Sequence, residues 1–144
     1  MRLLTSYDIT DLCSKYNIQI NGIHCRDDLP EHLHDGWYIL NLDRESGTGT
    51  HWTCFRVTAN GLSLYFDSFG FIPPKELSKK LGYYSYNGKK IQSLNTDSCG
   101  WWCLACIKYC EERANQTEAF GKFISLFKNK PNYNEKWLER YFNC

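Results

Sequence analysis

Apolar positions along the chain follow two different patterns, strand-like in the middle and helical towards both ends. The run from Gly36 to Leu42 is almost continuously apolar, which is typical of a strand buried on both faces. Two β-rich runs follow, 51–58 and 62–67, and the Ala59-Asn60-Gly61 segment between them predicts a hairpin. Together these runs predict a small sheet in the middle of the chain.

Helical patterns flank this sheet. A first helix is expected around Ile9 and Cys13, with Thr5 or Ser6 as its N-cap. Pro74 is expected in the first turn of a short helix that continues through Leu81. The C-terminal third predicts three more helices, with Pro131 separating the last two: Cys99–Arg113, 118–128 and 135–142.

The remaining segments predict short irregular structure. Residues 18–22 predict a short strand and turn, 24–35 a charged loop, 44–50 a flexible connection, and 85–94 a strand with a loop. Strands in the middle and helices at the end make an α+β domain. No linker divides the 144 residues, so we expect a single domain over 1–144.

Composition narrows the classes of function. The formal net charge is only +1, which argues against a strongly basic surface for nucleic acid or anionic membranes. The N-terminus does not resemble a signal peptide, and no apolar run reaches the length of a membrane span. We therefore expect a soluble protein that is not secreted and does not bind membranes.

Eight cysteines make sulfur chemistry a candidate; they stand at positions 13, 25, 54, 99, 103, 106, 110 and 144. Without an export signal, free thiols, a catalytic thiol or a metal site are favoured over a disulfide framework. Cys99, Cys103, Cys106 and Cys110 share one helical face, and core packing is the favoured interpretation of the last three.

A metal site is a weaker hypothesis. His24, His32 and His34 lie near Cys25 in a polar loop, but their irregular spacing favours solvated histidines over metal ligands.

Cys99 differs from the other cysteines because it opens a helix. Thr96, Asp97 and Ser98 are all residue types that cap helices. The first turn of a helix offers unpaired amides and the positive end of the dipole, which favour a thiolate and can donate to a developing oxyanion. Gly100 leaves room for a substrate backbone to approach. This pattern predicts that Cys99 is a nucleophile.

A nucleophilic cysteine needs a base and a group that orients the base. His51 opens a strand directly after a glycine-bearing loop, so its imidazole can reach a cleft. Asp67, at the end of the second hairpin strand, is the candidate acid. A solvated aspartate at the end of a strand is the alternative for Asp67.

The register of the hairpin decides between these interpretations of Asp67. A two-residue Asn60-Gly61 turn pairs Cys54 with Asp67 and places Asp67 on the sheet face opposite His51. A three-residue loop, with Gly61 left-handed, pairs Thr53 with Asp67 and makes Asp67 a diagonal neighbour of His51. Hydrophobic patterning mildly favours the first register, whereas the chemistry favours the second or a bulge. We predict the second.

Three motifs in this order resemble the adenovirus-type cysteine endopeptidases, the adenains. They are "GTHWTCFRV", "LYFDSFGF" and a glutamine, Gln92, seven residues before "CGWWC". The chain is similar, more distantly, to the SUMO and ubiquitin-like-specific proteases of the same clan. The "RESGTGTHW" loop and the "FDSFGF" turn point to the adenain branch, and the resemblance extends from about Thr5 to Glu112. It implies a papain-like fold of the ubiquitin-like-protease type, in which helices flank a small central mixed sheet and the nucleophile begins a buried helix.

The resemblance also implies a role for each motif residue. Cys99 would be the nucleophile, His51 the general base and then acid, and Asp67 the group that holds the imidazole tautomer. Gln92 would donate its side-chain amide to the oxyanion. Trp52 would line a narrow channel that admits small residues around the cut. No metal or other cofactor is implied.

The function implied is that of a viral maturation protease, which cleaves capsid or core precursors at glycine-containing sites within the virion and the host cell. The adenovirus enzymes carry a peptide activator on a disulfide between the positions matching Asp67 and Gln92. That segment looks shorter here and has no cysteine, so we expect that a peptide activator of this protein would act without the disulfide attachment. The near-neutral charge argues against DNA as an activator, and we expect a monomer. Two alternatives remain: a deconjugase of ubiquitin-like modifiers, and a non-catalytic binding module that keeps the protease fold.

Overall fold

The computed structural model describes residues 1–44, 47 and 51–143. Their helices and strands follow one another in the order α1 (Ser6–Tyr16), β1 (Gly22–Cys25), β2 (Gly36–Asn41), β3 (Trp52–Val57), β4 (Ser63–Phe66), α2 (Lys75–Leu81), β5 (Tyr84–Tyr86), α3 (Cys99–Glu111), α4 (Gln116–Ser125) and α5 (Pro131–Tyr141). The expected flexible connection over 44–50 falls mostly outside the described residues, as does Cys144.

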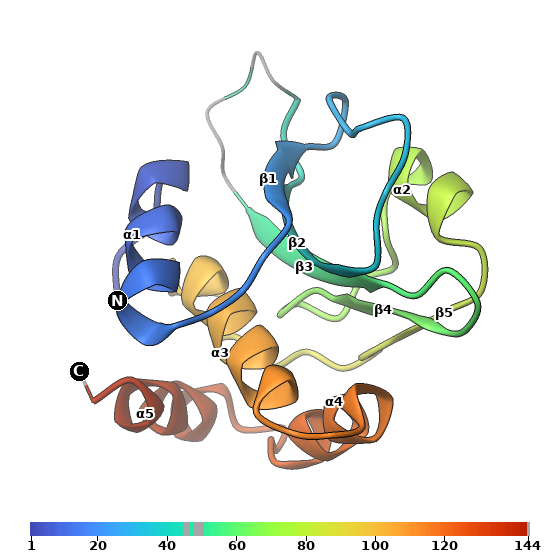
Figure 1. The fold of residues 1–144 in the computed structure, drawn as a ribbon. Coiled ribbons are helices and arrows are strands. Elements are labelled where there is room, and N and C mark those ends of the chain that lie inside the picture. The colour runs from blue at the N-terminus through green and yellow to red at the C-terminus, as the bar shows by residue number, and fades with distance from the viewer. Residues whose placement is uncertain (45–46, 48–50, 144) are drawn as a thin grey trace.

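The strands form one mixed sheet in the order β1-β2-β3-β4-β5. The two outer pairs are parallel and the two inner pairs are antiparallel. Figure 1 shows α3 running along one face of this sheet, with α4 and α5 beyond it and α1 at its side. The predicted α+β fold with a mixed central sheet is confirmed.

Side chains of both faces of the sheet are buried. Ile39, Cys54 and Phe66 belong to a core that includes the apolar residues of α3. Tyr38 and Phe55 belong to a second core on the opposite face, against α2. This two-sided burial explains the nearly continuous apolar run of β2, because successive side chains of a strand point to opposite faces.

Several boundaries differ from the sequence-based expectation. The first strand begins at Gly22 rather than at Ile18, because β1 pairs in parallel with the buried strand β2. Pro131 does not separate two helices but occupies the first turn of α5. A proline fits there because the backbone N–H that it lacks would have no hydrogen-bond partner within the helix. Pro74 is the N-cap of α2 rather than a residue of its first turn.

The register of the hairpin is the second of the two alternatives. Cys54 pairs with Phe66, and Arg56 pairs with Leu64. The turn itself differs from the prediction, because Gly61 does not have a positive φ. The connection runs instead from residue 58 to residue 62, between β3 and β4. A longer turn keeps the predicted pairing without a left-handed glycine.

The helix α1 begins as predicted at a capping residue. Thr5 accepts from the Asp8 backbone amide at 3.1 Å, and Asp8 accepts from the Thr5 amide at 2.8 Å. This capping box fixes the direction in which the chain enters α1. It thereby orients the preceding residue, Leu4, which is buried in the main core.

Within the part of the chain that the structure describes, no helix is both long enough and apolar enough to cross a membrane.

Candidate active site

His51 and Asp67 meet at one end of the sheet. His51 directly precedes β3 and Asp67 directly follows β4, so antiparallel pairing of the two strands brings them together. His51 Nε2 lies 2.8 Å from Asp67 Oδ1, within hydrogen-bonding distance. Asp67 is fully buried. The alternative of a solvated strand-end aspartate is wrong.

Asp67 is held in place by neighbours on two sides. Its Oδ1 also accepts from the backbone N–H of Phe69 at 2.8 Å. Asn87 clamps the Asp67 backbone: its Nδ2 donates to the Asp67 carbonyl at 2.7 Å, and its Oδ1 accepts from the Asp67 N–H at 3.2 Å. Among the described residues, Asp67 Oδ2 has no hydrogen-bond partner. The carboxylate therefore directs one oxygen, with a fixed orientation, at the imidazole.

The His51 ring is confined and strongly basic. It stacks on Phe69 with ring centroids 4.8 Å apart, and 16% of its side chain is exposed. Burial alone lowers the pKa of His51, but the hydrogen bond with Asp67 and the interaction with Cys99 outweigh it and raise the pKa to about 9. The ring is therefore an imidazolium at neutral pH.

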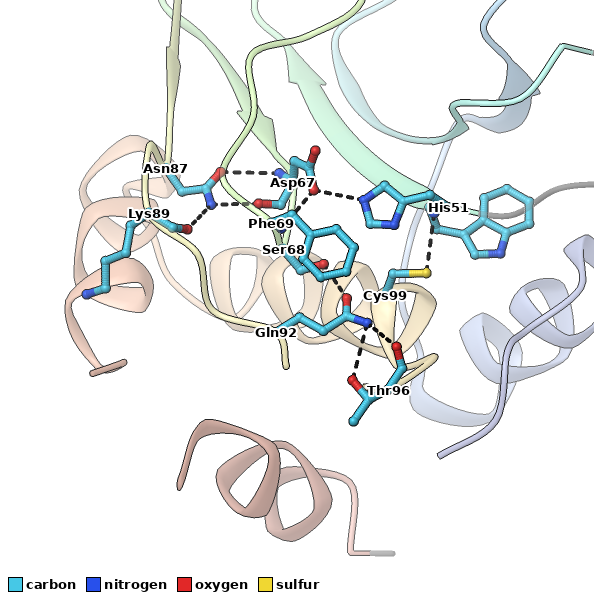
Figure 2. A network of polar contacts seen from close by, with 10 residues as sticks. His51, Asp67, Ser68, Phe69, Asn87, Lys89, Gln92, Thr96 and Cys99 are labelled. Atoms are coloured by element: carbon cyan, nitrogen blue, oxygen red, sulfur yellow. Dashed lines mark hydrogen bonds and ion pairs between the residues drawn. The ribbon is translucent and has the colours of Figure 1, made fainter. Parts of the chain in front are cut away.

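Cys99 is the first residue of α3. Trp52 is the residue next to His51, and its backbone N–H donates a hydrogen bond to Cys99 Sγ at 3.4 Å. Since Asp67 contacts Nε2 of the His51 ring, Nδ1 is the ring nitrogen left for the sulfur. Figure 2 shows the carboxylate, the imidazole and the thiol gathered in one region.

The helix α3 begins without a side-chain cap from its N-cap residue. Ser98 occupies the predicted N-cap position but makes no side-chain cap hydrogen bond. Its hydroxyl donates instead to Glu135. The Ser98 side chain therefore does not occupy the N-terminal amides of α3, which are the groups that can donate to an anion at a helix start.

The other cysteines of α3 are core residues, as predicted. Cys103, Cys106 and Cys110 are fully buried. Burial raises the pKa of Cys103 and of Cys106 well above the ordinary thiol value. Cys103 and Cys106 therefore act as neutral packing groups in the core.

Gln92 lies in the loop between β5 and α3 and is almost fully buried. Its Oε1 accepts from Ser68 Oγ at 2.6 Å. Its Nε2 donates to the Thr96 carbonyl at 2.8 Å and, over a longer 3.3 Å, to Thr96 Oγ1. Both ends of the amide are thus occupied within the protein, and the weaker of the two donated bonds is the one to Thr96 Oγ1.

Trp52 and Gly100 are both placed against the N-terminal segment. The Trp52 indole N–H donates to the Leu4 carbonyl at 2.7 Å, and Trp52 is 5% exposed. A Cβ on Gly100 would lie 3.0 Å from Leu4 Cδ1. The expectation that Gly100 makes room for a substrate backbone is therefore corrected: the space beside Gly100 is filled by Leu4.

A cavity of about 380 Å³ lies beside Trp52. Its walls include Leu4, His24 and Asn41. The Asn41 side chain is buried, and its Nδ2 has no hydrogen-bond partner among the described residues. The lining mixes apolar side chains with polar and charged ones, Asp28 and Arg44 among them, and such a mixed lining suits a segment of peptide.

The metal site considered for the histidines of the 24–34 segment has no counterpart among the residues that the structure describes. Within the described residues, no group of three or more His, Cys, Asp or Glu side chains is placed to hold a metal ion. His24 instead lies 3.9 Å from a carboxylate oxygen of Asp28.

A comparison with solved structures finds the same fold in the ASFV pS273R protease. A selenomethionine crystal structure of that protein matches with a TM-score of 0.54 and 19% identity, over 83% of this chain and 62% of the other. A second crystal structure matches with a TM-score of 0.52 and 18% identity, over 83% and 61%. This chain therefore spans about three fifths of the length of the ASFV protease.

The likeness confirms the predicted cysteine protease fold of the ubiquitin-like-protease type. It does not single out the adenain branch. No family model matches the sequence, and no curated protein is significantly similar to it.

The sequence did not point to several residues of the site. Phe69 belongs to the "FDSFGF" motif, but nothing in that motif indicates that its ring stacks on His51. Asn87 and Glu135 contact segments distant in the chain, and no local pattern marks them. Thr96 was a candidate helix cap, but its carbonyl binds Gln92 instead.

Proposed function

We propose that this protein is a cysteine endopeptidase of the adenain type that matures viral precursor proteins. The observation that carries the proposal is the line of contacts from Asp67 through His51 to Cys99 at the start of a buried helix. The fold shared with the ASFV pS273R protease supports it. By the same proposal, the substrates are capsid or core precursors in the virion and the host cell.

The proposed reaction is acyl transfer through a thioester. The Cys99 thiolate, paired with the His51 imidazolium, attacks the carbonyl carbon of the scissile peptide bond. The imidazolium then gives its proton to the leaving amine, and the C–N bond breaks. Neutral His51 next takes a proton from water, which attacks the thioester and releases the acid and the thiolate. Asp67 keeps Nε2 engaged, so Nδ1 remains the nitrogen that exchanges protons.

The oxyanion formed in both steps needs donors already in place. The backbone N–H of Cys99 is one donor, and the Gln92 side chain is the other. Gln92 can keep its 2.8 Å bond to the Thr96 carbonyl and turn its second N–H from the long Thr96 Oγ1 contact to the oxyanion.

Replacing Gln92 with alanine should lower kcat on the order of a hundredfold or more, because one oxyanion donor is lost. KM should change much less, since the donor acts mainly on the charge of the transition state. Steady-state hydrolysis of one peptide by both proteins measures the split. A variant that raises KM at unchanged kcat would show that Gln92 contacts substrate in another way.

The pH profile should show the unusual basicity of His51. With a pKa of about 9, the imidazolium persists through neutral pH and is lost above pH 9. We therefore expect kcat/KM to have an alkaline limb near pH 9, with a tenfold loss per pH unit beyond it. Rates measured between about pH 6 and about pH 10.5 test this. A limb near the ordinary imidazole value of about 6.5 would contradict the strong pairing with Asp67.

The narrow site favours small substrate residues. Cys99 is only 2% exposed, and the backbone N–H of Trp52 lies 3.4 Å from its sulfur. An extended peptide with glycine next to the cut fits such a site best. The cavity beside Trp52 then offers a place for a larger residue of the substrate.

Hydrolysis of a peptide library tests the proposed function. We expect cleavage at glycine-containing sites, and faster cleavage of peptides derived from capsid or core precursors than of ubiquitin-like precursors. Preferred cleavage of a folded ubiquitin-like precursor would instead support a deconjugase. If no peptide is cleaved, the protein would share only its fold with the proteases. That result would support a non-catalytic binding module.

A further inference from the structure

Glu135, on the C-terminal helix α5, is the centre of a polar cluster next to the candidate active site. Its Oε1 accepts from Thr96 Oγ1 at 2.7 Å and from Ser98 Oγ at 2.8 Å. The backbone N–H of Ser93 lies 3.3 Å from the same oxygen. One carboxylate therefore ties together three residues of the loop that joins Gln92 to Cys99.

The contact with Thr96 extends to Gln92. Thr96 has one hydroxyl proton, and the short distance to a carboxylate favours its donation to Glu135. The Thr96 oxygen then presents its lone pairs to Gln92 Nε2, 3.3 Å away. The Thr96 carbonyl accepts from the same nitrogen, and Ser68 donates to the amide oxygen. These contacts fix both ends of the Gln92 amide, with its NH₂ group against Thr96.

The contact with Ser98 extends to the start of α3. A serine at the N-cap usually turns its oxygen back to the amides of its own helix. Ser98 does not, because its hydroxyl lies within 3.0 Å of both oxygens of Glu135. Glu135 therefore keeps the Ser98 side chain away from the amides that begin at Cys99.

The neighbouring residue of α5 holds the other end of the same loop. Asn134 is fully buried, and its Nδ2 donates to the Ile91 carbonyl at 3.2 Å. Asn134 is itself fixed by two hydrogen bonds with the Lys128 backbone. Consecutive residues of α5 thus bind both ends of the 91–98 segment, which carries Gln92 and leads into Cys99.

We propose that Glu135 is the positioning residue of the oxyanion site. Its carboxylate holds Thr96 and Ser98 so that the Gln92 amide and the Cys99 N–H converge on one oxygen. The catalytic consequence rests on the proposed function, whereas the effect on Gln92 rests on the contacts alone. The α5 helix, which lies outside the three motifs, then sets the geometry of the reaction.

Glu135→Gln is the sharpest test, because it keeps the shape of the side chain. It removes the negative charge and replaces one carboxylate oxygen with an NH₂ group. That group is a donor, and it would face the Thr96 and Ser98 hydroxyls, which are donors as well. The matched control is Glu139→Gln, the same change one turn later on the exposed face of α5. We expect Glu135→Gln to lower kcat on the order of tenfold or more at nearly constant KM, and Glu139→Gln to leave both unchanged.

Two further measurements separate positioning from a general loosening of the fold. Alkylation of Cys99 by iodoacetamide forms no oxyanion, so its rate should be the same in wild type and Glu135→Gln. In a Gln92→Ala background, Glu135→Gln should lower kcat by a smaller factor than in the wild-type background, because only its effect through Ser98 on the Cys99 amide is left. Parallel losses of hydrolysis and alkylation would overturn the proposal.

The Gln92 side-chain amide reports positioning without any turnover. In NMR spectra, Glu135→Gln should shift the two Gln92 amide protons and speed their exchange with solvent, and Glu139→Gln should not. An unchanged Gln92 signal would overturn the inference even if kcat fell. If the wild-type protein hydrolyses no peptide, the proposed function fails, but this signal still decides whether Glu135 positions Gln92.

Discussion

Cys99→Ala should abolish peptide hydrolysis while the fold remains intact. No other group near His51 can form the thioester, so we expect a loss in kcat on the order of 10⁵-fold or more, as for the removal of a nucleophile in related mechanisms. Cys99 is a small residue at a helix start, and alanine is a good helix former, so stability should change little. Peptide hydrolysis, circular dichroism and thermal unfolding together measure both effects.

Cys106→Ala is the matched control for this variant. It removes a thiol from the same helical face, but from a fully buried position in the core. We expect a small loss of thermal stability from the cavity and near wild-type kcat/KM. A Cys99→Ala protein with wild-type activity would remove the basis of the proposed mechanism.

Asp67→Asn should lower kcat/KM on the order of a thousandfold. Asparagine keeps an oxygen where Asp67 accepts from His51 and from the Phe69 amide, so the geometry should survive. The charge is lost, however, and burial of His51 then dominates and lowers its pKa. The imidazolium would be scarce at neutral pH, and with it the thiolate that it stabilises.

The pH profile distinguishes this electrostatic loss from misfolding. The alkaline limb of kcat/KM in Asp67→Asn should move to lower pH than the wild-type limb near 9. Asp11→Asn, the same change on the exposed side of α1, is the control and should leave rate and profile unchanged. An Asp67→Asn protein with reduced activity but an unmoved limb would show that Asp67 does not set the His51 pKa.

Much of the site could be predicted because its residues lie at the ends of regular elements. A cysteine after capping residues and a histidine and an aspartate at the ends of adjacent strands each have a local signal. The hairpin register was less certain, because the sheet is buried on both faces. Alternation of apolar residues then discriminates poorly between registers and mildly favoured the wrong one, and only the need to bring Asp67 to His51 favoured the observed pairing.

Other features depend on contacts between distant parts of the chain. The filling of the space beside Gly100 by Leu4 follows from the path into α1. Ser98 was expected among the capping residues, but a carboxylate from α5 competes for its hydroxyl. The sequence around Gly100 fits contact with a substrate backbone as well as packing against Leu4. The sequence around Ser98 likewise fits a helix cap as well as a hydrogen bond to a carboxylate. Only the tertiary structure shows which role each residue takes.

The central claim is that Cys99 is activated by His51. A peptide probe that ends in glycine and carries a thiol-reactive vinyl ester, mapped by mass spectrometry, tests it most directly. The account predicts that the probe modifies Cys99 selectively and that His51→Ala slows this modification on the order of a hundredfold or more. Labelling that follows solvent exposure, with half-buried Cys25 modified before Cys99, or an undiminished rate in His51→Ala, would contradict it.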